Sequence, residues 1–161
     1  MTITYIGLGS NLGDPVQQLE QALSALRTLP GSRLLNQSSF YRSKPLGDAE
    51  QPDYVNAAVM LETSLAAARL LEYLQDIEKN QGRIRDSRRW QARTLDLDLL
   101  LYGGERIVTD DLVVPHPELA NRNFVLIPLA EITPDLNIPG KGRVKDLLAD
   151  AGMAGIVKID N

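Results

Sequence analysis

The sequence contains no cysteine and a single histidine among its 161 residues. Without cysteine the chain can form neither disulfide bonds nor thiolate metal sites. It has no apolar run long enough to span a membrane, and its first ten residues, MTITYIGLGS, lack the basic start and apolar stretch of a signal peptide. These absences favour a cytoplasmic protein that does not act in or on a membrane.

Charge and composition are those of an ordinary globular protein. The chain is 43% hydrophobic and 24% charged, which suits one domain over residues 1–161 with its own core. A formal net charge of −4 argues against a nucleic-acid-binding protein, which would usually be basic. The positive charge is nevertheless concentrated, because five arginines lie within eleven residues, at Arg83, Arg85, Arg88, Arg89 and Arg93.

Hydrophobic periodicity and capping signals predict an α+β fold. Asp14, Pro15 and Gln17 have the pattern of a helix N-terminus, and Ser64 is the expected cap of a second helix that ends at Gly82. The predicted core has the βαββαβ order of a ferredoxin-like fold, with helices on a largely antiparallel sheet. Its strands are expected at 2–8, 33–41, 54–63 and in the run ending at Tyr102, followed by a hairpin of 106–108 with 112–114 and by shorter C-terminal elements.

Two carboxylates interrupt the last core strand, in the run Leu95-Asp96-Leu97-Asp98-Leu99. Because side chains alternate across a strand, Asp96 and Asp98 should share one face and the leucines the other. Two like charges beside a core are unfavourable unless a cation lies between them. The preceding arginines can supply that charge in salt bridges, and a divalent metal that also binds phosphate is the alternative.

The glycines near the N-terminus do not form a nucleotide-binding motif. Gly7, Gly9 and Gly13 have the spacing G-x-G-x-x-x-G rather than G-x-G-x-x-G, and no parallel βαβ pair is predicted after them. The sequence also lacks the Gly-Lys-Ser/Thr of a P-loop. This stretch is interpreted as a tight turn.

Three side chains would suit a planar ligand. Tyr54 and Asn56 should share one strand face beside a loop rich in proline and glycine, and Phe124 follows a polar segment. Two rings and an amide are a typical lining for a heterocycle rich in hydrogen-bonding groups, although each alone is usually core or loop. His116, the only histidine, is more often structural than catalytic in such a setting.

Residue patterns along most of the chain resemble the 6-hydroxymethyl-7,8-dihydropterin pyrophosphokinases, folate-pathway enzymes that transfer pyrophosphate from ATP to a pterin alcohol. The block Arg93-Thr94-Leu95-Asp96-Leu97-Asp98 is the most specific match. The family's αβα fold with a ferredoxin-like core agrees with the predicted element order. The other matching stretches are 9–13, 39–43, 51–58, Glu78 with 81–83, Arg89-Trp90, 114–116, and Asn121-Arg122 with Phe124.

The resemblance implies roles for individual residues. Asp96 and Asp98 would hold two Mg²⁺ ions, and Arg83 and Arg93 would act with them in catalysis. Tyr54 and Phe124 would sandwich the pterin ring. The whole implied pterin site is Ser43, Pro45, Leu46, Gly47, Tyr54, Asn56, Trp90, Asp96 and Phe124.

ATP would act as co-substrate in a second implied set. It consists of Gln75, Glu78, Arg85, Arg89, Trp90, Arg93, Leu99, His116 and Arg122. Asp111, Val113 and Pro117 depart from residues that family members can place near ATP. The departures concern nucleotide contacts rather than the reaction.

The sequence therefore favours an ATP- and Mg²⁺-dependent pyrophosphokinase that binds two small molecules and is expected to be a monomer. Two rival functions fit the sequence less well. A noncatalytic pterin- or nucleotide-binding regulator would not require the Asp96–Asp98 pair together with Arg83 and Arg93. An acidic structural domain with an internal Asp–Arg network leaves Tyr54, Asn56 and Phe124 unexplained.

Overall fold

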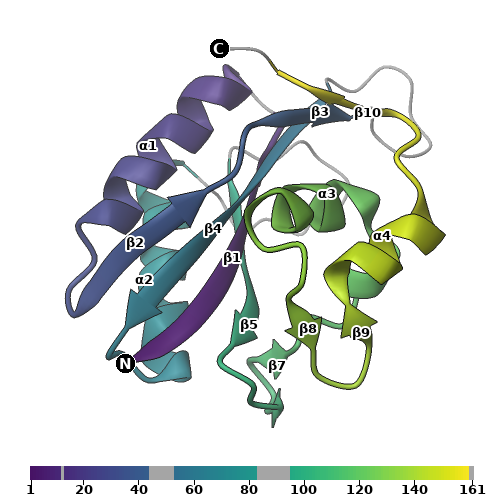
Figure 1. Ribbon diagram of the computed structural model, residues 1–161. Coiled ribbons are helices and arrows are strands. Elements are labelled where there is room, and N and C mark those ends of the chain that lie inside the picture. Colours follow the sequence, from purple (N-terminus) through teal and green to yellow (C-terminus); the bar gives the residue numbers. More distant parts are fainter. Residues whose placement is uncertain (12, 44–52, 83–94, 160–161) are drawn as a thin grey trace.

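The computed structural model describes residues 1–11, 13–43, 53–82 and 95–159. Figure 1 shows how the helices and strands are arranged. The elements are β1 (Thr2–Ser10), α1 (Pro15–Arg27), β2 (Ser32–Gln37), β3 (Tyr41–Ser43), β4 (Tyr54–Thr63), α2 (Ala67–Asn80), β5 (Asp96–Tyr102), β6 (Ile107–Val108), β7 (Val113–Val114), the 3₁₀ turn η1 (Leu119–Asn121), α3 (Asn123–Ile132), β8 (Asn137–Ile138), β9 (Gly142–Arg143), α4 (Val144–Ala151) and β10 (Ile156–Lys158).

A six-stranded antiparallel sheet forms the centre of the molecule. Its strand order is β10-β3-β4-β1-β5, and β2 pairs with the remaining length of β4. The helices α1 and α2 connect β1 to β2 and β4 to β5, as in a ferredoxin-like fold. The predicted α+β fold class is confirmed, and the hairpin predicted after the core is present as β6 and β7.

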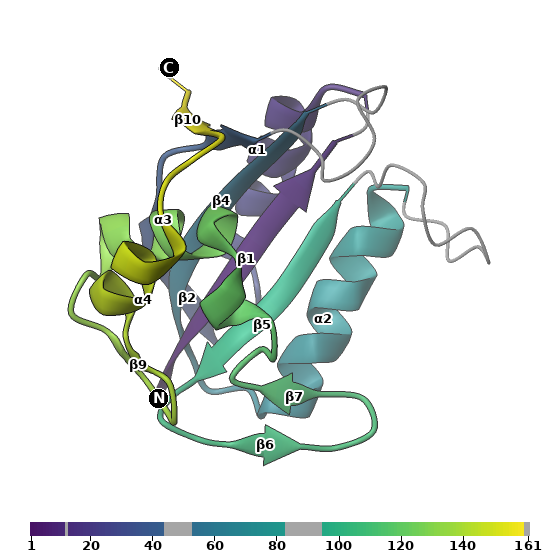
Figure 2. The ribbon, with the colours of Figure 1, turned by 90° about the vertical axis from the view of Figure 1, so that its right-hand side faces the viewer.

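Two hydrophobic clusters fix helices on both faces of the sheet. Ile6 and Leu8 of β1 pack with buried residues of α1 and α2, among them Leu19 and Leu74. On the other face, Tyr5, Ala58 and Leu100 pack with buried residues of α3 and α4. Figure 2 shows α2 on one side of the sheet and the α3–α4 pair on the other. The layers are therefore αβα, as the family resemblance implies.

The two helix N-termini differ in how well the sequence predicts them. Asp14 caps α1 as expected, because its side chain accepts a hydrogen bond of 3.2 Å from the backbone N–H of Gln17. Ser64 does not cap α2, and that prediction is wrong. Its hydroxyl instead donates to the carbonyl of Gly31 at 3.1 Å, and α2 begins only at Ala67.

The single strand expected over residues 33–41 is two strands, β2 and β3, and this expectation is also corrected. Between them the backbone N–H of Ser38 donates to Ala58 O, while Ala58 N–H donates to the hydroxyl oxygen of Ser38, both at 2.9 Å. A side chain thus replaces a backbone carbonyl in the ladder, and the regular pairing stops there. The break lets β2 and β3 pair with different parts of β4.

We expect Ser38→Ala to lower the free energy of unfolding by about 1–3 kcal/mol, because the buried N–H of Ala58 would lose its acceptor. Urea denaturation measures the change. Ser24→Ala, on the exposed side of α1, is the matched control and should leave the free energy of unfolding nearly unchanged. Equal stabilities for the two variants would contradict the role of Ser38.

Candidate active site

The strand β5 presents its two carboxylates as the alternation predicts. Asp96 and Asp98 are partly exposed, whereas Leu97 and Leu99 are buried in the cluster with α1 and α2. Asp96 lies opposite Gly9 of β1, and Asp98 lies opposite Gly7. Because glycine has no side chain, neighbouring side chains lie over β1 here: Asn56 Nδ2 is 2.8 Å from where a Cβ of Gly9 would stand, and the Leu100 side chain is 3.4 Å from that of Gly7.

The pair of carboxylates suits one kind of metal. Among the described residues, no group of three or more His, Asp or Glu side chains comes together that could hold a metal ion. Mg²⁺ does not require such a group, because it commonly takes one or two carboxylates together with substrate phosphates. The donor set of Asp96 and Asp98 therefore fits Mg²⁺ that arrives with a polyphosphate.

Glu78 of α2 fixes the strand between these carboxylates. Its side chain is only 4% exposed, and its Oε2 accepts a hydrogen bond of 2.9 Å from the backbone N–H of Leu97. Since β5 is the last strand of the sheet, this N–H has no neighbouring strand in the described structure. Glu78, which the resemblance assigns to ATP, thus also holds the backbone from which Asp96 and Asp98 project.

Three adjacent strands bring the predicted pterin and metal residues side by side. Asn56 of β4 lies opposite Gly9, and Gly9 lies opposite Asp96 of β5. Directly opposed residues in a sheet point to the same face, and strands are about 4.8 Å apart. The amide of Asn56 and the carboxylate of Asp96 therefore project from backbone positions about 10 Å apart on the face that carries α3.

Asn56 has hydrogen-bonding capacity that the described residues do not use. Its Nδ2 approaches the carbonyl of Leu8 at 3.4 Å, whereas its buried Oδ1 accepts no hydrogen bond from them. A buried acceptor without a donor is unfavourable, so it suits a ligand that brings its own N–H. Tyr54 lies two residues earlier on the same face of β4, as predicted.

A second group lies at the start of α3. Arg122 is the N-cap of α3, and its guanidinium carbon is 5.7 Å from the centre of the half-buried Phe124 ring. His116 donates its backbone N–H to Leu100 O at 3.0 Å, and its Nδ1 accepts from the N–H of Glu118 at 3.2 Å. In the neutral imidazole the proton is therefore on Nε2.

The pKa of His116 lies below its ordinary value of 6.5. Burial is the main cause, and the positive charge of Arg122 adds to it, whereas Asp98 and Glu118 act in the opposite direction. These electrostatic contributions place His116 near both Asp98 and Arg122. The imidazole is consequently neutral at pH 7 and keeps its Nδ1 acceptor.

A match to a family model settles the kinship of this chain. Residues 5–134 match the model described as 7,8-dihydro-6-hydroxymethylpterin-pyrophosphokinase (HPPK). The chain belongs to the HPPK family. A relative from Haemophilus influenzae, named 2-amino-4-hydroxy-6-hydroxymethyldihydropteridine pyrophosphokinase, is 48% identical over 160 residues that cover 99% of each chain. A Pseudomonas aeruginosa relative of the same name is 46% identical over 155 residues, which are 96% of this chain and 95% of its own.

Solved structures support the HPPK fold. The crystal structure of wild-type Plasmodium falciparum HPPK-DHPS with pteroate superposes with a TM-score of 0.74 at 14% identity. The superposition covers 92% of this chain and 44% of the longer one. At this identity the likeness concerns the fold.

The remaining predicted HPPK site residues fall into two groups. Ser43 is buried on β3 opposite Tyr54, Gln75 is half-buried on α2, and Leu99 is buried on the face of β5 away from the carboxylates. The others lie outside the described residues, and they are Pro45, Leu46, Gly47, Arg83, Arg85, Arg89, Trp90 and Arg93.

Gly9 is a candidate site residue to which the sequence pattern assigns no role in the site. The pattern places it in a turn, yet it lies in β1 between Asn56 and Asp96. A Cβ at this position would stand 2.8 Å from Asn56 Nδ2, which is closer than real contacts allow. A glycine near the end of a strand, where a backbone or ligand must approach closely, was the available signal.

We expect Gly9→Ala to weaken binding of 6-hydroxymethyl-7,8-dihydropterin by about tenfold or more, because the new methyl group displaces the amide of Asn56. Isothermal titration calorimetry measures the dissociation constant. Gly104→Ala is the control, since a Cβ there meets nothing within 4 Å. If Gly9→Ala bound the pterin as tightly as Gly104→Ala, the close approach of Gly9 to Asn56 would have no bearing on the site.

We expect a proton NMR titration of His116 to give a pKa below 6.5, because burial disfavours the imidazolium. His116 is the only histidine, so its Cε1–H signal needs no further assignment. The lowered pKa means that the folded chain binds this proton less tightly than the unfolded chain does. Its contribution to stability is therefore complete above pH 6.5 and is lost as the pH falls from 6.5 toward the folded pKa. A midpoint at or above 6.5 would contradict the burial argument.

Proposed function

We propose that this chain transfers the pyrophosphoryl group of ATP to the hydroxymethyl oxygen of 6-hydroxymethyl-7,8-dihydropterin, in folate biosynthesis. Membership of the HPPK family and near-full-length relatives with pyrophosphokinase names support this activity. The structural observation that carries it is the row formed by Asn56, Gly9 and Asp96 on adjacent strands. It sets a group suited to a heterocycle beside a group suited to a metal–phosphate complex.

The pterin would bind over β4 and under the start of α3. The unused Oδ1 of Asn56 would accept a hydrogen bond from an N–H of the pterin ring. The rings of Tyr54 and Phe124 would stack on the two faces of the pterin, which needs a flat apolar slot. Bound in this way, the hydroxymethyl group would point along the row toward Asp96.

Asp96 and Asp98 would hold Mg²⁺, as two ions in this proposal. When bound, the metal would neutralise charge on the phosphate oxygens and lower the pKa of the pterin hydroxyl. The hydroxymethyl oxygen forms a bond to the β-phosphorus and loses its proton to solvent, while the bond from that phosphorus to the oxygen bridging to the α-phosphate breaks and AMP leaves with that oxygen. Phosphoryl-type transfer depends mostly on positioning and on charge stabilisation, which suits a site rich in arginine.

The nucleotide phosphates would lie near His116 and Arg122. Because Nδ1 of His116 accepts from the backbone, its Nε2–H is available as a donor to a phosphate oxygen. Arg122 adds a fixed positive charge at the start of α3. Arg83 and Arg93 are proposed to stabilise the charge on the transferred group, and Gln75, Arg85, Arg89 and Trp90 to contact the nucleotide, on the family resemblance.

We also propose that the protein acts as a single domain and as a monomer in the cytoplasm. Both hydrophobic clusters pack on one sheet, which supports the single domain. Within the described residues, no helix is long and apolar enough to cross a bilayer.

Mass spectrometry of the products tests the reaction. With ATP, Mg²⁺ and 6-hydroxymethyl-7,8-dihydropterin, the wild-type protein should yield AMP and a pterin that carries two added phosphates. ADP with a pterin monophosphate would mean transfer of the γ-phosphate instead. Absence of product while the pterin still binds would favour a noncatalytic binding protein.

Asp98→Asn in the same assay tests the metal site. The rate should fall by about 100-fold or more while pterin affinity stays nearly unchanged, because the amide keeps the shape but loses the charge that attracts Mg²⁺. Asp135→Asn is the matched control, since that exposed carboxylate pairs with Lys145 at 3.1 Å outside the site. An Asp98→Asn protein as active as the control would remove the metal role.

A further inference from the structure

A glutamate near the end of α3 joins this helix to the segment that precedes β3 and to β3 itself. Both oxygens of the Glu131 carboxylate accept hydrogen bonds from Ser39, with Oε1 2.9 Å from the backbone nitrogen and Oε2 2.8 Å from Oγ. Oε1 also accepts from the hydroxyl of Tyr41 at 2.7 Å. Three hydrogen bonds therefore connect segments about 90 residues apart in the sequence.

The protonation states keep these hydrogen bonds formed at neutral pH. Burial would raise the pKa of the Glu131 carboxyl, but the hydrogen bonds from Tyr41 and Ser39 and the charge of Lys158 hold it below its ordinary value. Burial, and then the hydrogen bond to Glu131, raise the pKa of the Tyr41 hydroxyl far above its usual range. Glu131 is thus an anion and Tyr41 a donor.

Tyr41 and Glu131 belong to the elements that form opposite sides of the proposed pterin-binding slot. Tyr41 lies directly opposite Asn56, at the outer end of the row that continues through Gly9 to Asp96. Phe124 precedes Glu131 by seven residues on α3, which is two helical turns, or about 10 Å along the same face. The hydrogen bonds of Glu131 therefore fix the position and rotation of α3, which carries Phe124, relative to β3. The strand β3 in turn pairs with β4, which carries Asn56.

We propose that Glu131 is a positioning residue that sets the gap between Phe124 and the Asn56 strand and thereby tunes affinity for the pterin. This inference rests on the proposed function. Glu131 touches neither substrate in this scheme and acts through α3. The stretch from Ser39 to Ser43, which matches the family without an assigned role for Ser39 or Tyr41, gains one here.

Hydrogen bonds of Glu131 that served only stability would have other consequences. Their loss would lower the free energy of unfolding, and the folded fraction would bind both substrates as before. A positioning residue should instead affect the two substrates unequally, because the proposed ATP contact at His116 lies before α3, whereas Phe124 lies within it.

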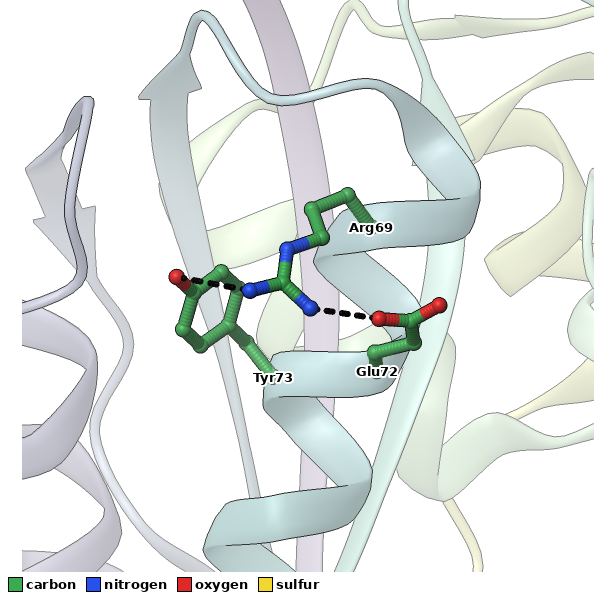
Figure 3. A network of polar contacts seen from close by, with 3 residues as sticks. All are labelled: Arg69, Glu72 and Tyr73. Atoms are coloured by element: carbon green, nitrogen blue, oxygen red, sulfur yellow. Dashed lines mark hydrogen bonds and ion pairs between the residues drawn. The ribbon is translucent and has the colours of Figure 1, made fainter.

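The test compares Glu131→Gln and Tyr41→Phe with Glu72→Gln. Glu72 is the matched control, because it is an exposed helical carboxylate that accepts from Arg69 at 2.5 Å, while Arg69 also contacts Tyr73 (Figure 3). The hydrogen bonds of that network join residues of α2 only. Calorimetry gives the dissociation constants for 6-hydroxymethyl-7,8-dihydropterin and, separately, for α,β-methylene ATP, whose scissile bond cannot be cleaved.

Glu131→Gln should weaken pterin binding by about fivefold or more, with a smaller loss in Tyr41→Phe, which breaks one hydrogen bond of three. Affinity for α,β-methylene ATP should stay within about twofold in both variants, and Glu72→Gln should change neither affinity. If Glu131→Gln failed to fold, Tyr41→Phe would decide in the same way.

Pterin affinity within twofold of wild type in the folded variants would overturn the proposal. An equal loss for both ligands would do the same, because it would indicate a general structural effect. If the wild-type protein itself bound no pterin, the proposed function would fail together with this inference. Tight wild-type binding with unaltered variants would remove this inference alone.

Discussion

The structure depends on a central strand that is apolar on one face and carries two glycines on the other. Ile6 and Leu8 of β1 anchor the sheet to α1 and α2, while Gly7 and Gly9 face the opposite side. Because β1 lies between β4 and β5, the glycine at position 9 lets the amide of Asn56 lie over β1, with Nδ2 2.8 Å from the place that a Cβ would take. A larger residue at Gly9 would displace this amide and so disturb the side of the site that faces Asp96.

The strand β4 organises the rest of the site around these glycines. It pairs with β1 from Val55 to Thr63 and shares its other edge between β2 and β3. The hydroxyl of Ser38 makes that division possible, because it takes over one backbone contact where the two strands separate. The short strand β3 then holds Tyr41 and Ser43 beside the residues of β4 that face the proposed pterin.

Local patterns in the sequence were sufficient wherever the deciding contact is local. The N-cap at Asp14 and the alternation of Asp96 and Asp98 follow from neighbours within a few residues, and both are confirmed. The roles proposed for individual site residues stay predictions. Many of the arginines on which the resemblance relies lie outside the described residues.

Contacts between distant segments could not be predicted from the sequence. Ser64 is a residue type that is common at helix N-caps, but its hydroxyl donates instead to the carbonyl of Gly31, 33 residues away. Glu131 looks like an ordinary helical surface residue until the fold brings Tyr41 to it. Gly9 gains its meaning only from the registers of two neighbouring strands. In each case the residue can be seen in the sequence, but its contact partner is defined only by the tertiary structure.

The contact of Glu78 with Leu97 also bears on solubility. An edge strand with the composition of β5, rich in leucine, is a template for pairing with strands of other molecules, which leads to aggregation. Glu78 occupies the backbone N–H of Leu97 on that edge, and two aspartates interrupt the apolar run. The opposite edge is formed by β2 and by β10, and β10 is only three residues long and ends in Lys158. The carboxylates of Glu78, Asp96 and Asp98, which belong to the proposed site, thus also disfavour pairing of β5 with strands of other copies of the chain.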